Sequence, residues 1–566
     1  MEGKYILKTA KKLLSSIVAA SLLLFGACSS EQGELLTLEV YAGRANYQGM
    51  QKGWYAKIVR DKFNLEFNII APNISKGGSL LFESRLSAGK VGDIVIASYD
   101  NMTACVEAGI LADLTPYLKK TTYLKNYLDV IKTVNERLGY DGIYIIPTSM
   151  STMPPTEPML YGAGPELASY MPWGYYKEIG CPEIKNEEDL LDALTLMQEK
   201  HPYNEKGDKV YAFSLFQDWD VGHMSLAANM ARSFGYVCTT PTFFTSADLR
   251  RISPLTEDNG IYYRMLHLYF EANQRGLLDP ESGVQSFSTM YEKAQNRQVI
   301  YLWWAWMPGN YDDGSLMERY VFIPVSTEPV VCDGFRKYGD GYAYAIGKDV
   351  KDIKRVIAYL DWTASPDGMM SFWAGLENVG FIYENGKPVY TSFSMEAWEK
   401  GLTLSEEYGG GTYAEGYCQF NDSIVEKKDI NPETGEPYHS ENWSSTLKGN
   451  TGVASREWSE HFGVETPVEY LIKNNLLDVI INTDYVAGKE SREMQLIRDK
   501  CGSIIKEYSW KMVFAESEEQ FLDYWQTMKE LLSLNGYAQA EAADLRVIEE
   551  LRERREVVLR DINNSK

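Results

Sequence analysis

The sequence predicts an α/β protein organised as two lobes. Apolar segments of strand length alternate with amphipathic helical segments in the first part of the chain, which is the pattern of βαβ units. The chain has 566 residues, which is too long for one ordinary hydrophobic core. The sequence shows no internal repeat and no long low-complexity linker, so we expect compact lobes rather than a repeat array.

The chain begins with a pattern typical of a secretory signal. Four lysines precede a short apolar run at residues 13–25, and small residues and Cys28 follow in FGACSS. The cysteine and its surroundings resemble a bacterial lipobox, in which the peptide is cut before the cysteine, which then carries a lipid. We expect residues 1–27 to be a lipoprotein signal peptide and residues 28–34 a tether. An ordinary signal peptide with an incidental cysteine is the alternative.

The first elements alternate regularly. Strands are predicted at residues 35–43, 65–72, 91–98 and 142–149, and helices at about 47–61, in the amphipathic segment that ends near Gly89, and at about 101–108. Asp100 is a candidate N-cap of the last helix, and Gly109 a glycine that follows its end. Residues 142–149 contain Pro147 and are expected to cross between the lobes.

Further elements are predicted beyond this crossing. Helices are expected at 186–200, capped by Asn186, and at 260–280, with strands at 209–216, 297–306 and 319–325. Residues 341–375 read as a strand and a helix followed by a second helix start at Ser365-Pro366-Asp367. The Asn-Gly pair within 383–390 predicts a hairpin. Residues 405–455 are rich in turn residues, and the tail from about residue 516 is helical.

Charge and motifs exclude several functions. The formal net charge is −23, and it becomes −26 without residues 1–27, so nucleic-acid binding is disfavoured. The same charge disfavours anionic substrates unless a local basic pocket overrides it. The cysteines other than Cys28 are scattered, and none of the five histidines lies in a metal or nucleophile motif. We therefore expect no cofactor and no metal. A glycosidase carboxylate pair stays open, because it is defined by separation in space.

Three stretches combine aromatic and polar residues just after predicted strands. They are SYDN at 98–101, QDWD at 217–220 and YLWWAW at 301–306. Flat aromatic rings match the C–H faces of a sugar, and carboxylates or amides match its hydroxyl groups. Ligands of open α/β sheets bind beyond the carboxyl ends of strands. Asp100 could instead only cap its helix, and Trp303 should point away from Trp304, so one of these two is expected in the core.

Several segments resemble the extracellular solute-binding lipoproteins of bacterial ABC importers, in the carbohydrate-binding family that includes maltose-binding proteins. Residues 92–118, GDIVIASYDNMTACVEAGILADLTPYL, are similar to a family segment in which a strand precedes a polar ligand loop and a helix. WAW at 304–306 resembles the strand end whose first Trp stacks on a sugar, and FQDW at 216–219 lies where the family has an aromatic platform. NQRGLLDPES, NPETGEPY and FLDYWQTMKELLSLNGY are similar to a long branch found in oligosaccharide-utilising bacteria.

The resemblance implies a type II periplasmic-binding-protein-like fold, in which each lobe holds a mainly parallel sheet flanked by helices. Residues 35–148 and 330–372 would form lobe 1, and residues 149–329 and 373–566 lobe 2. The chain would be a monomeric binding protein, not an enzyme, that captures a carbohydrate for an ABC permease. It would lie on the extracytoplasmic face of the cell membrane, held by its lipid alone. The predicted ligand-binding residues are Asp100, Trp219, Trp304, Tyr99, Asn101, Trp306, Trp373 and Glu377.

Two other functions compete with this one. A secreted carbohydrate-active enzyme, such as a glycosidase or lyase, would use the same aromatic and acidic residues and would release products. A binding protein for a non-sugar ligand such as a peptide would use the aromatic residues as apolar pockets. The fold alone does not decide among them.

Overall fold

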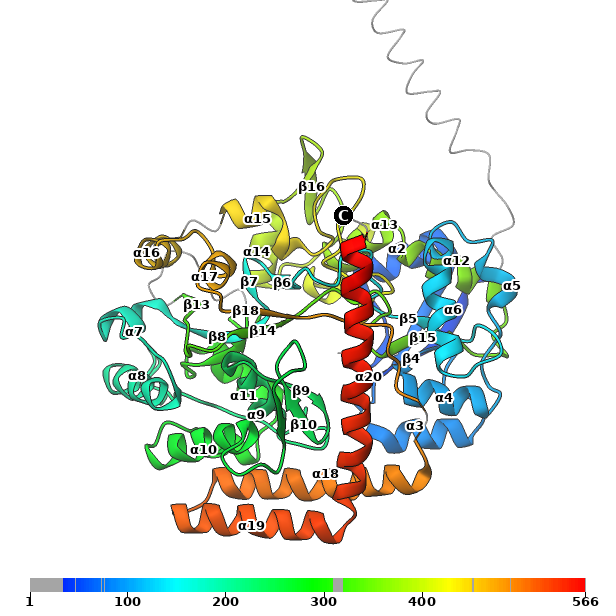
Figure 1. Ribbon diagram of the computed structural model, residues 1–566. Coiled ribbons are helices and arrows are strands. Elements are labelled where there is room, and N and C mark those ends of the chain that lie inside the picture. The colour runs from blue at the N-terminus through cyan, green and yellow to red at the C-terminus, as the bar shows by residue number, and fades with distance from the viewer. Residues whose placement is uncertain are drawn as a thin grey trace, which may run out of the picture.

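The computed structural model describes residues 34–308 and 319–564, apart from residues 46, 73, 76, 450, 451 and 489. The expected signal peptide at 1–27 and the lipidation site Cys28 lie outside the described residues. Within the described part, the buried side chains divide the molecule into a first lobe, with one cluster on each face of its sheet, and a second lobe with a single cluster, drawn at the right and left of Figure 1.

A mixed sheet of six strands forms the centre of the first lobe, in the order β2-β3-β1-β4-β15-β5. Strand β1 pairs in parallel with β3 and β4, whereas β15 is antiparallel to both β4 and β5. Four strands therefore share one direction. The strands are β1 (Leu36–Ala42), β2 (Gly49–Met50), β3 (Leu65–Ile70), β4 (Ile94–Ser98), β5 (Ile146–Pro147) and β15 (Tyr342–Ile346).

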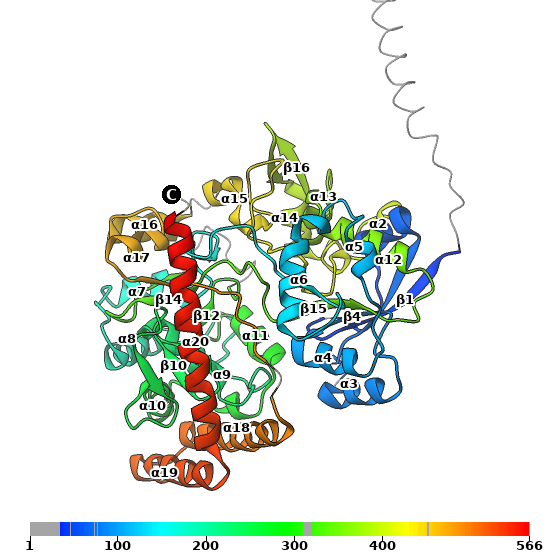
Figure 2. The same cartoon turned by 45° about the vertical axis from the view of Figure 1, so that its right-hand side comes forward.

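Helices cover both faces of this sheet, as Figure 2 shows. Neighbouring strand residues point to opposite faces, so Val40 enters one buried cluster and Tyr41 the other. The helices of the lobe are α2 (Gly53–Phe63), α3 (Gly78–Ser87), α4 (Tyr99–Glu107), α5 (Thr115–Leu118), α6 (Leu128–Arg137), α12 (Ile353–Thr363), α13 (Pro366–Trp373), α14 (Ser392–Lys400) and α15 (Ser444–Gly449), with a hairpin of β16 (Phe381–Glu384) and β17 (Lys387–Tyr390).

The second lobe is mainly helical around small sheets. Its sheets are β12-β8-β13 and β11-β10-β9, both antiparallel, and the parallel pair β14-β18. The strands are β8 (Leu167–Pro172), β9 (Val237–Thr240), β10 (Phe243–Thr245), β11 (Ile252–Pro254), β12 (Leu302–Trp304), β13 (Tyr320–Phe322), β14 (Val330–Asp333) and β18 (Leu477–Ile480), and a two-stranded ribbon of β6 (Leu160–Tyr161) and β7 (Gly164–Pro165) lies before them in the chain. This lobe therefore lacks, among its described residues, the mainly parallel sheet that was expected.

Long helices close the second lobe at its lower and front sides in Figure 1. Helix α18 packs against α10 and α19, and the final helix α20 crosses the front of the molecule and contacts β9 and β10. The helices are α7 (Trp173–Glu178), α8 (Glu187–Lys200), α9 (Ser225–Met230), α10 (Ile261–Gln274), α11 (Phe287–Gln295), α16 (Val453–Phe462), α17 (Pro467–Lys473), α18 (Arg492–Val513), α19 (Glu518–Leu534) and α20 (Tyr537–Asn564).

The division of the chain between the cores differs from the expected boundaries. Tyr413, Phe420 and Trp443 are buried in the first-lobe core, although residues 373–566 were expected in the second lobe. The indole N–H of Trp54 donates to the carbonyl O of Tyr413 over 2.9 Å, which ties this late segment to α2. Conversely, Val330 of β14 belongs to the second core. The late turn-rich segment therefore completes the first lobe.

Local signals predicted several element ends correctly. The Asn186 side chain accepts from the backbone N–H of Asp189 at the start of α8, and Ser365 caps α13 in the same way. Asn385 and Gly386 both have positive φ and join β16 to β17, as a primed hairpin turn requires. The N-cap expected at Asp100 is wrong, because Ser98 caps α4 and Asp100 lies in its first turn.

The six cysteines of the described chain are free thiols, four of them buried and two half-buried: Cys105, Cys332, Cys418 and Cys501, then Cys181 and Cys238. Burial raises the pKa of several of these thiols to about 12 (Cys105, Cys238, Cys332 and Cys418). These thiols stay protonated at neutral pH and act as small apolar side chains.

Candidate functional site

A cavity of about 300 Å³ lies between the two lobes. Trp304, from the second-lobe core, and Trp373, which packs against the first-lobe core, both line it. Most of the other lining residues are charged, five basic and five acidic: Arg44, Arg232, Arg336, Lys427 and Lys428, with Glu166, Asp333, Asp340, Asp422 and Glu426. The cavity therefore joins two flat rings to a dense set of hydrogen-bonding groups.

The alternation of side chains along β12 brings Trp304 to the cavity. Trp303 points the other way, is 1% exposed and donates its indole N–H to the hydroxyl of Tyr269 over 3.0 Å. Trp304 is 8% exposed, and its ring meets Trp219 edge-on with centroids 5.3 Å apart. As expected, one of the adjacent tryptophans is buried in the core, and the other lines the cavity.

Trp373 is the last residue of α13, and two contacts orient its ring. Its indole N–H donates to the Ser423 hydroxyl over 2.9 Å, and the Lys427 ammonium lies 4.9 Å from the ring centroid. An ammonium over an indole face is attracted by the ring quadrupole. The ring thus supports a cation in the cavity.

Arg44 holds two carboxylates at the first-lobe side of the cavity. Its Nη1 lies 2.8 Å from both Asp340 and Asp422, and its guanidinium lies 3.5 Å from the centroid of the Tyr342 ring. Burial, together with Asp340, raises the pKa of Asp422 to about 6, although Arg44 opposes this. Burial alone would also raise the pKa of Asp340, but Arg44 and the Thr148 hydroxyl hold it below its usual value.

A second charged group lies at the second-lobe side. Asp333 is 3.4 Å from Arg232 and 3.2 Å from Arg336, and Lys428 forms an ion pair with Glu166. Burial opposes ionisation of Asp333, but Arg232 and Arg336 hold its pKa well below its usual range. Burial also opposes ionisation of Glu166, but the nearby Lys428 lowers the pKa of this carboxyl below its usual value. Both carboxylates are ionised at neutral pH.

Trp219 and Trp306 lie next to the cavity wall without lining it. Their rings pack with Trp304, at centroid distances of 5.3 Å and 6.0 Å, and Trp219 is 37% exposed. The Phe287 ring lies 4.4 Å from the Trp219 ring, tilted by 30°. Trp219 and Trp306 therefore pack against the Trp304 ring.

The other predicted residues lie elsewhere. Asp100 and Glu377 are exposed, and the Asn101 backbone N–H donates to the Ser98 hydroxyl. The Tyr99 hydroxyl donates to the carbonyl O of Tyr338 over 3.2 Å. None of these four residues lines the cavity. Their roles in binding stay predictions.

None of the ten charged residues of the cavity was predicted from the sequence. They come from short segments that are far apart in the chain, around Arg44, Glu166, Arg232, residues 333–340 and residues 421–428. The only local signal is the density of charge in DGFRKYGD and VEKKD, which by itself resembles an ordinary solvated loop.

One group of side chains outside the cavity has metal-ligand chemistry. The ligand atoms of His267, Glu271 and Glu518 lie within 4.8 Å of one another, on α10 and the start of α19. His267 Nε2 is 3.0 Å from a carboxylate oxygen of Glu518, and all three side chains are partly exposed. The hydrogen bond accounts for this pair without a cation.

Across the described residues, every helix is too short or too polar to cross a membrane.

Comparison with solved structures identifies the architecture. The chain is similar to the alginate-binding protein AlgQ2, with 14% identity, a TM-score of 0.63 and coverage of 93% of this chain and 98% of that one. It is also similar to the S. pneumoniae ABC-transporter substrate-binding protein FusA in complex with kestose, with 13% identity, a TM-score of 0.59 and coverage of 91% and 99%.

A third similar structure is an HMO-binding, ABC-transporter-associated solute-binding protein from Bifidobacterium longum infantis ATCC 15697, with 12% identity, a TM-score of 0.58 and coverage of 93% and 99%. No protein-family model and no curated protein sequence matches the chain. The predicted two-lobed, type II periplasmic-binding-protein-like fold is confirmed, and it is the fold of the solute-binding proteins of ABC transporters.

Proposed function

We propose that this protein is a lipid-anchored, extracytoplasmic binding protein that captures a carbohydrate for an ABC importer. The observation that carries the proposal is the pair Trp304 and Trp373, supplied by different lobes to one charged cavity. The shared fold with solute-binding proteins supports it. Cys28 would carry the lipid, the chain would act as a monomer, and the membrane subunits of the permease would be its partner.

Binding would proceed by closure of the lobes on the sugar. The Trp304 ring would stack on a C–H face of the sugar, while the Arg44 and Arg336 guanidiniums and their carboxylate partners would face the hydroxyl groups. Both lobes contribute contacts, so the ligand binds the closed arrangement more tightly and shifts the population toward it. The permease would recognise this closed form.

A thermal-shift screen over mono- and oligosaccharides tests the proposal, because a ligand that prefers the folded state raises Tm. At a ligand concentration of 100 Kd the stabilisation is about 2.7 kcal/mol. Trp304→Ala is expected to abolish the shift. Trp398→Ala, which removes an exposed Trp of α14 outside the cavity, should retain it. If no carbohydrate shifts the wild-type Tm, the proposal fails.

The enzyme alternative rests on Asp340 and Asp422. The pKa values of these two cavity carboxylates are pushed in opposite directions, as in acid–base pairs of glycosidases. Both nevertheless bond to Arg44, which favours a structural pair. Incubation with each bound oligosaccharide followed by product analysis separates the two functions, since turnover lost in Asp422→Asn would establish an enzyme.

A further inference from the structure

We infer that the cavity selects a saccharide that carries a negative charge, and that Lys427 is the residue facing that charge. The charge would be an anionic group on a sugar ring, either a carboxylate or a sulfate. The inference rests on the proposed carbohydrate function and names the substrate class of the same site.

The first step is the pairing of the basic side chains around the cavity. Arg44 is matched by two aspartates, Lys428 by Glu166, and Arg232 and Arg336 share Asp333. Lys427 differs from them, because within the described residues its ammonium has no hydrogen-bond or ion-pair partner. Its nearest fixed contact is the Trp373 ring at 4.9 Å.

The second step is the balance of charge near Lys427. The charged group at the second-lobe side, taken together with Glu426 and Lys427, carries four basic side chains and three acidic ones: Arg232, Arg336, Lys427 and Lys428, against Glu166, Asp333 and Glu426. Glu426 is buried, and one of its oxygens accepts from the backbone N–H of Lys428 over 3.2 Å. This part of the cavity therefore keeps an excess positive charge, although the chain as a whole is strongly acidic.

The third step is the positive potential that the neighbouring groups experience. Burial, together with Lys427 and Lys428, holds the pKa of the His439 imidazole well below its usual value. Burial also lowers the pKa of the Lys427 ammonium, opposed by Glu166 and reinforced by Lys428. A half-buried ammonium without a direct ion pair among the described residues is unfavourable by itself, and an anion of the ligand would relieve this.

The fourth step is geometry. The Ser423 hydroxyl fixes the Trp373 indole, and this ring holds the Lys427 ammonium inside the cavity that Trp304 also lines. A sugar stacked on Trp304 would present its substituents to the other lining residues, among which Lys427 offers three N–H donors. Hydrogen bonds between ionised groups are about twice as strong as neutral ones, so the charge would decide which sugar is selected.

The experiment compares matched ligands by calorimetry on the full chain. The ligands are oligouronides containing galacturonate, mannuronate, guluronate or glucuronate, their carboxyl-reduced counterparts of equal length, and sulfated galactan oligosaccharides with desulfated counterparts. We expect at least one charged ligand to bind about ten- to a hundredfold more tightly than its neutral counterpart. A preference among the oligouronides would identify the anion as a carboxylate, and a preference among the sulfated oligosaccharides would identify it as a sulfate.

Variants of Lys427 assign the preference to this side chain. Lys427→Met should remove the preference for the charged ligand, and Lys427→Arg should keep it. Lys209→Met is the matched control, because the Lys209 ammonium also lies over a ring, 4.8 Å from the Tyr211 centroid, but is exposed outside the cavity. A wild-type preference that survives Lys427→Met overturns the assignment to Lys427.

The outcomes separate this inference from the proposed function. If the neutral ligands bind as tightly as their charged counterparts, or more tightly, the inference is overturned while carbohydrate binding stands. If no saccharide of either set or of the wider screen binds, both fail.

Discussion

Adjacent tryptophans on β12 carry out different tasks because side chains alternate along a strand. Trp303→Ala should lower the free energy of unfolding by about 3–5 kcal/mol, since it empties a buried site and leaves the Tyr269 hydroxyl without its donor. Trp304→Ala should lower it less, yet abolish the ligand-induced rise in Tm. Chemical denaturation and calorimetry measure the two effects. Equal losses of stability in both variants would contradict the division.

Asp422 makes the free energy of unfolding depend on pH. Its pKa in the folded state is about 6, above the value of about 3.9 for an unfolded aspartate. The folded state therefore holds the proton more tightly, so the stability that Asp422 contributes is fully present below about pH 4 and is lost as the pH rises to about 6. The loss is on the order of 3 kcal/mol.

Denaturation of the wild type and Asp422→Asn at pH 4, 5, 6 and 7 checks this prediction, because the other titrating groups cancel in the difference. The stability of the wild type relative to the variant should fall over this range. A difference that stays flat, or rises with pH, would refute it.

Sequence reasoning found the aromatic part of the cavity and missed its charged part. Successive tryptophans at a strand end indicated the site, and the resemblance of WAW at 304–306 to a sugar-stacking strand end selected Trp304. Arg44 and Asp422 lie far apart in the chain and meet only because the late segment folds back onto the first lobe. Asp100 lies outside the cavity, and its role stays a prediction, because a polar residue in the first turn of a helix looks the same in a sequence whether it faces ligand or solvent.

Helix α20 is attached to the second lobe by a buried carboxylate. Asp544 is 1% exposed, accepts from the Thr242 hydroxyl over 2.7 Å, and pairs with Arg498 Nη2 at 2.6 Å. Asp544→Ala should lower the free energy of unfolding by about 3 kcal/mol, since the loss of one partner leaves buried groups unsatisfied. Hydrogen exchange in residues 537–564 should speed up more than in α19.

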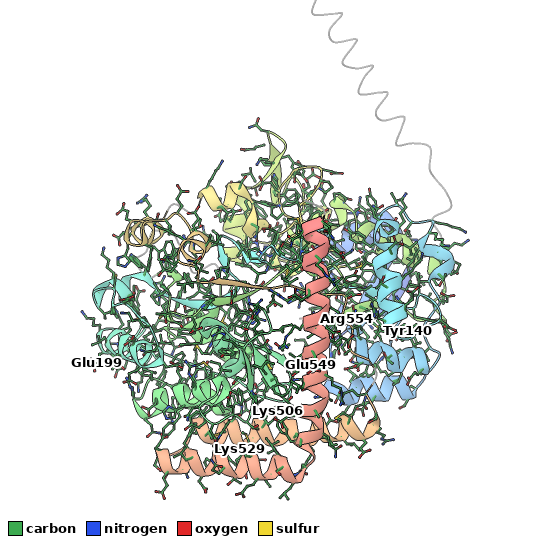
Figure 3. The ribbon with its side chains drawn as sticks, in the orientation of Figure 1. Tyr140, Glu199, Lys506, Lys529, Glu549 and Arg554 are labelled. Atoms are coloured by element: carbon green, nitrogen blue, oxygen red, sulfur yellow. The ribbon has the colours of Figure 1, made fainter. Side chains whose placement is uncertain are left out.

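Glu549→Ala is the control for this prediction. Glu549 lies exposed on the same helix, as labelled in Figure 3, so its loss should change stability by less than about 0.5 kcal/mol. Similar exchange rates in the two variants would show that Asp544 does not hold the helix.

The ends of elements that carry local capping or turn residues were predicted correctly. The lengths of strands that depend on pairing with distant segments were not. The caps of α8 and α13 and the β16–β17 turn follow from two or three residues each. Residues 209–216 were predicted as a strand but form only single bridges, Lys209 with Tyr203, Tyr211 with Val299 and Phe213 with Leu278. The apolar pattern shows burial, whereas the length of a strand depends on what pairs with it.

At the scale of the molecule, an ion-pair triad connects the lobes. Asp484 lies 2.8 Å from Arg137 of α6 and 2.7 Å from Arg554 of α20, which Figure 3 labels. The groups are partly exposed, so each pair is worth at most about 1 kcal/mol. Because the triad forms in the arrangement that encloses the cavity, Arg137→Ala should weaken ligand binding by up to about fivefold at low salt, and less at high salt.

Arg60→Ala serves as the matched control, since the Arg60–Glu66 pair is also on the surface but lies within the first lobe. Calorimetry at two ionic strengths measures both variants. If Arg60→Ala loses as much affinity as Arg137→Ala, the ion pairs between the lobes do not explain the weaker binding.

The lobe boundaries were the least predictable property of the chain. Two lobes follow from length and from alternation of strands and helices, but composition does not show on which core a late segment packs. Residues such as Tyr413 and Trp443 would suit either core, and only tertiary contact assigns them to the first.

Strand β15 has a consequence for the growing polypeptide. Its residues Tyr342–Ile346 fill the space between β4 and β5, which are made much earlier, so the sheet has an open seam until this late stretch arrives. Unpaired strand edges recruit other chains. A nascent chain stopped near residue 150 should therefore aggregate instead of folding, and premature termination there would yield no useful half-protein.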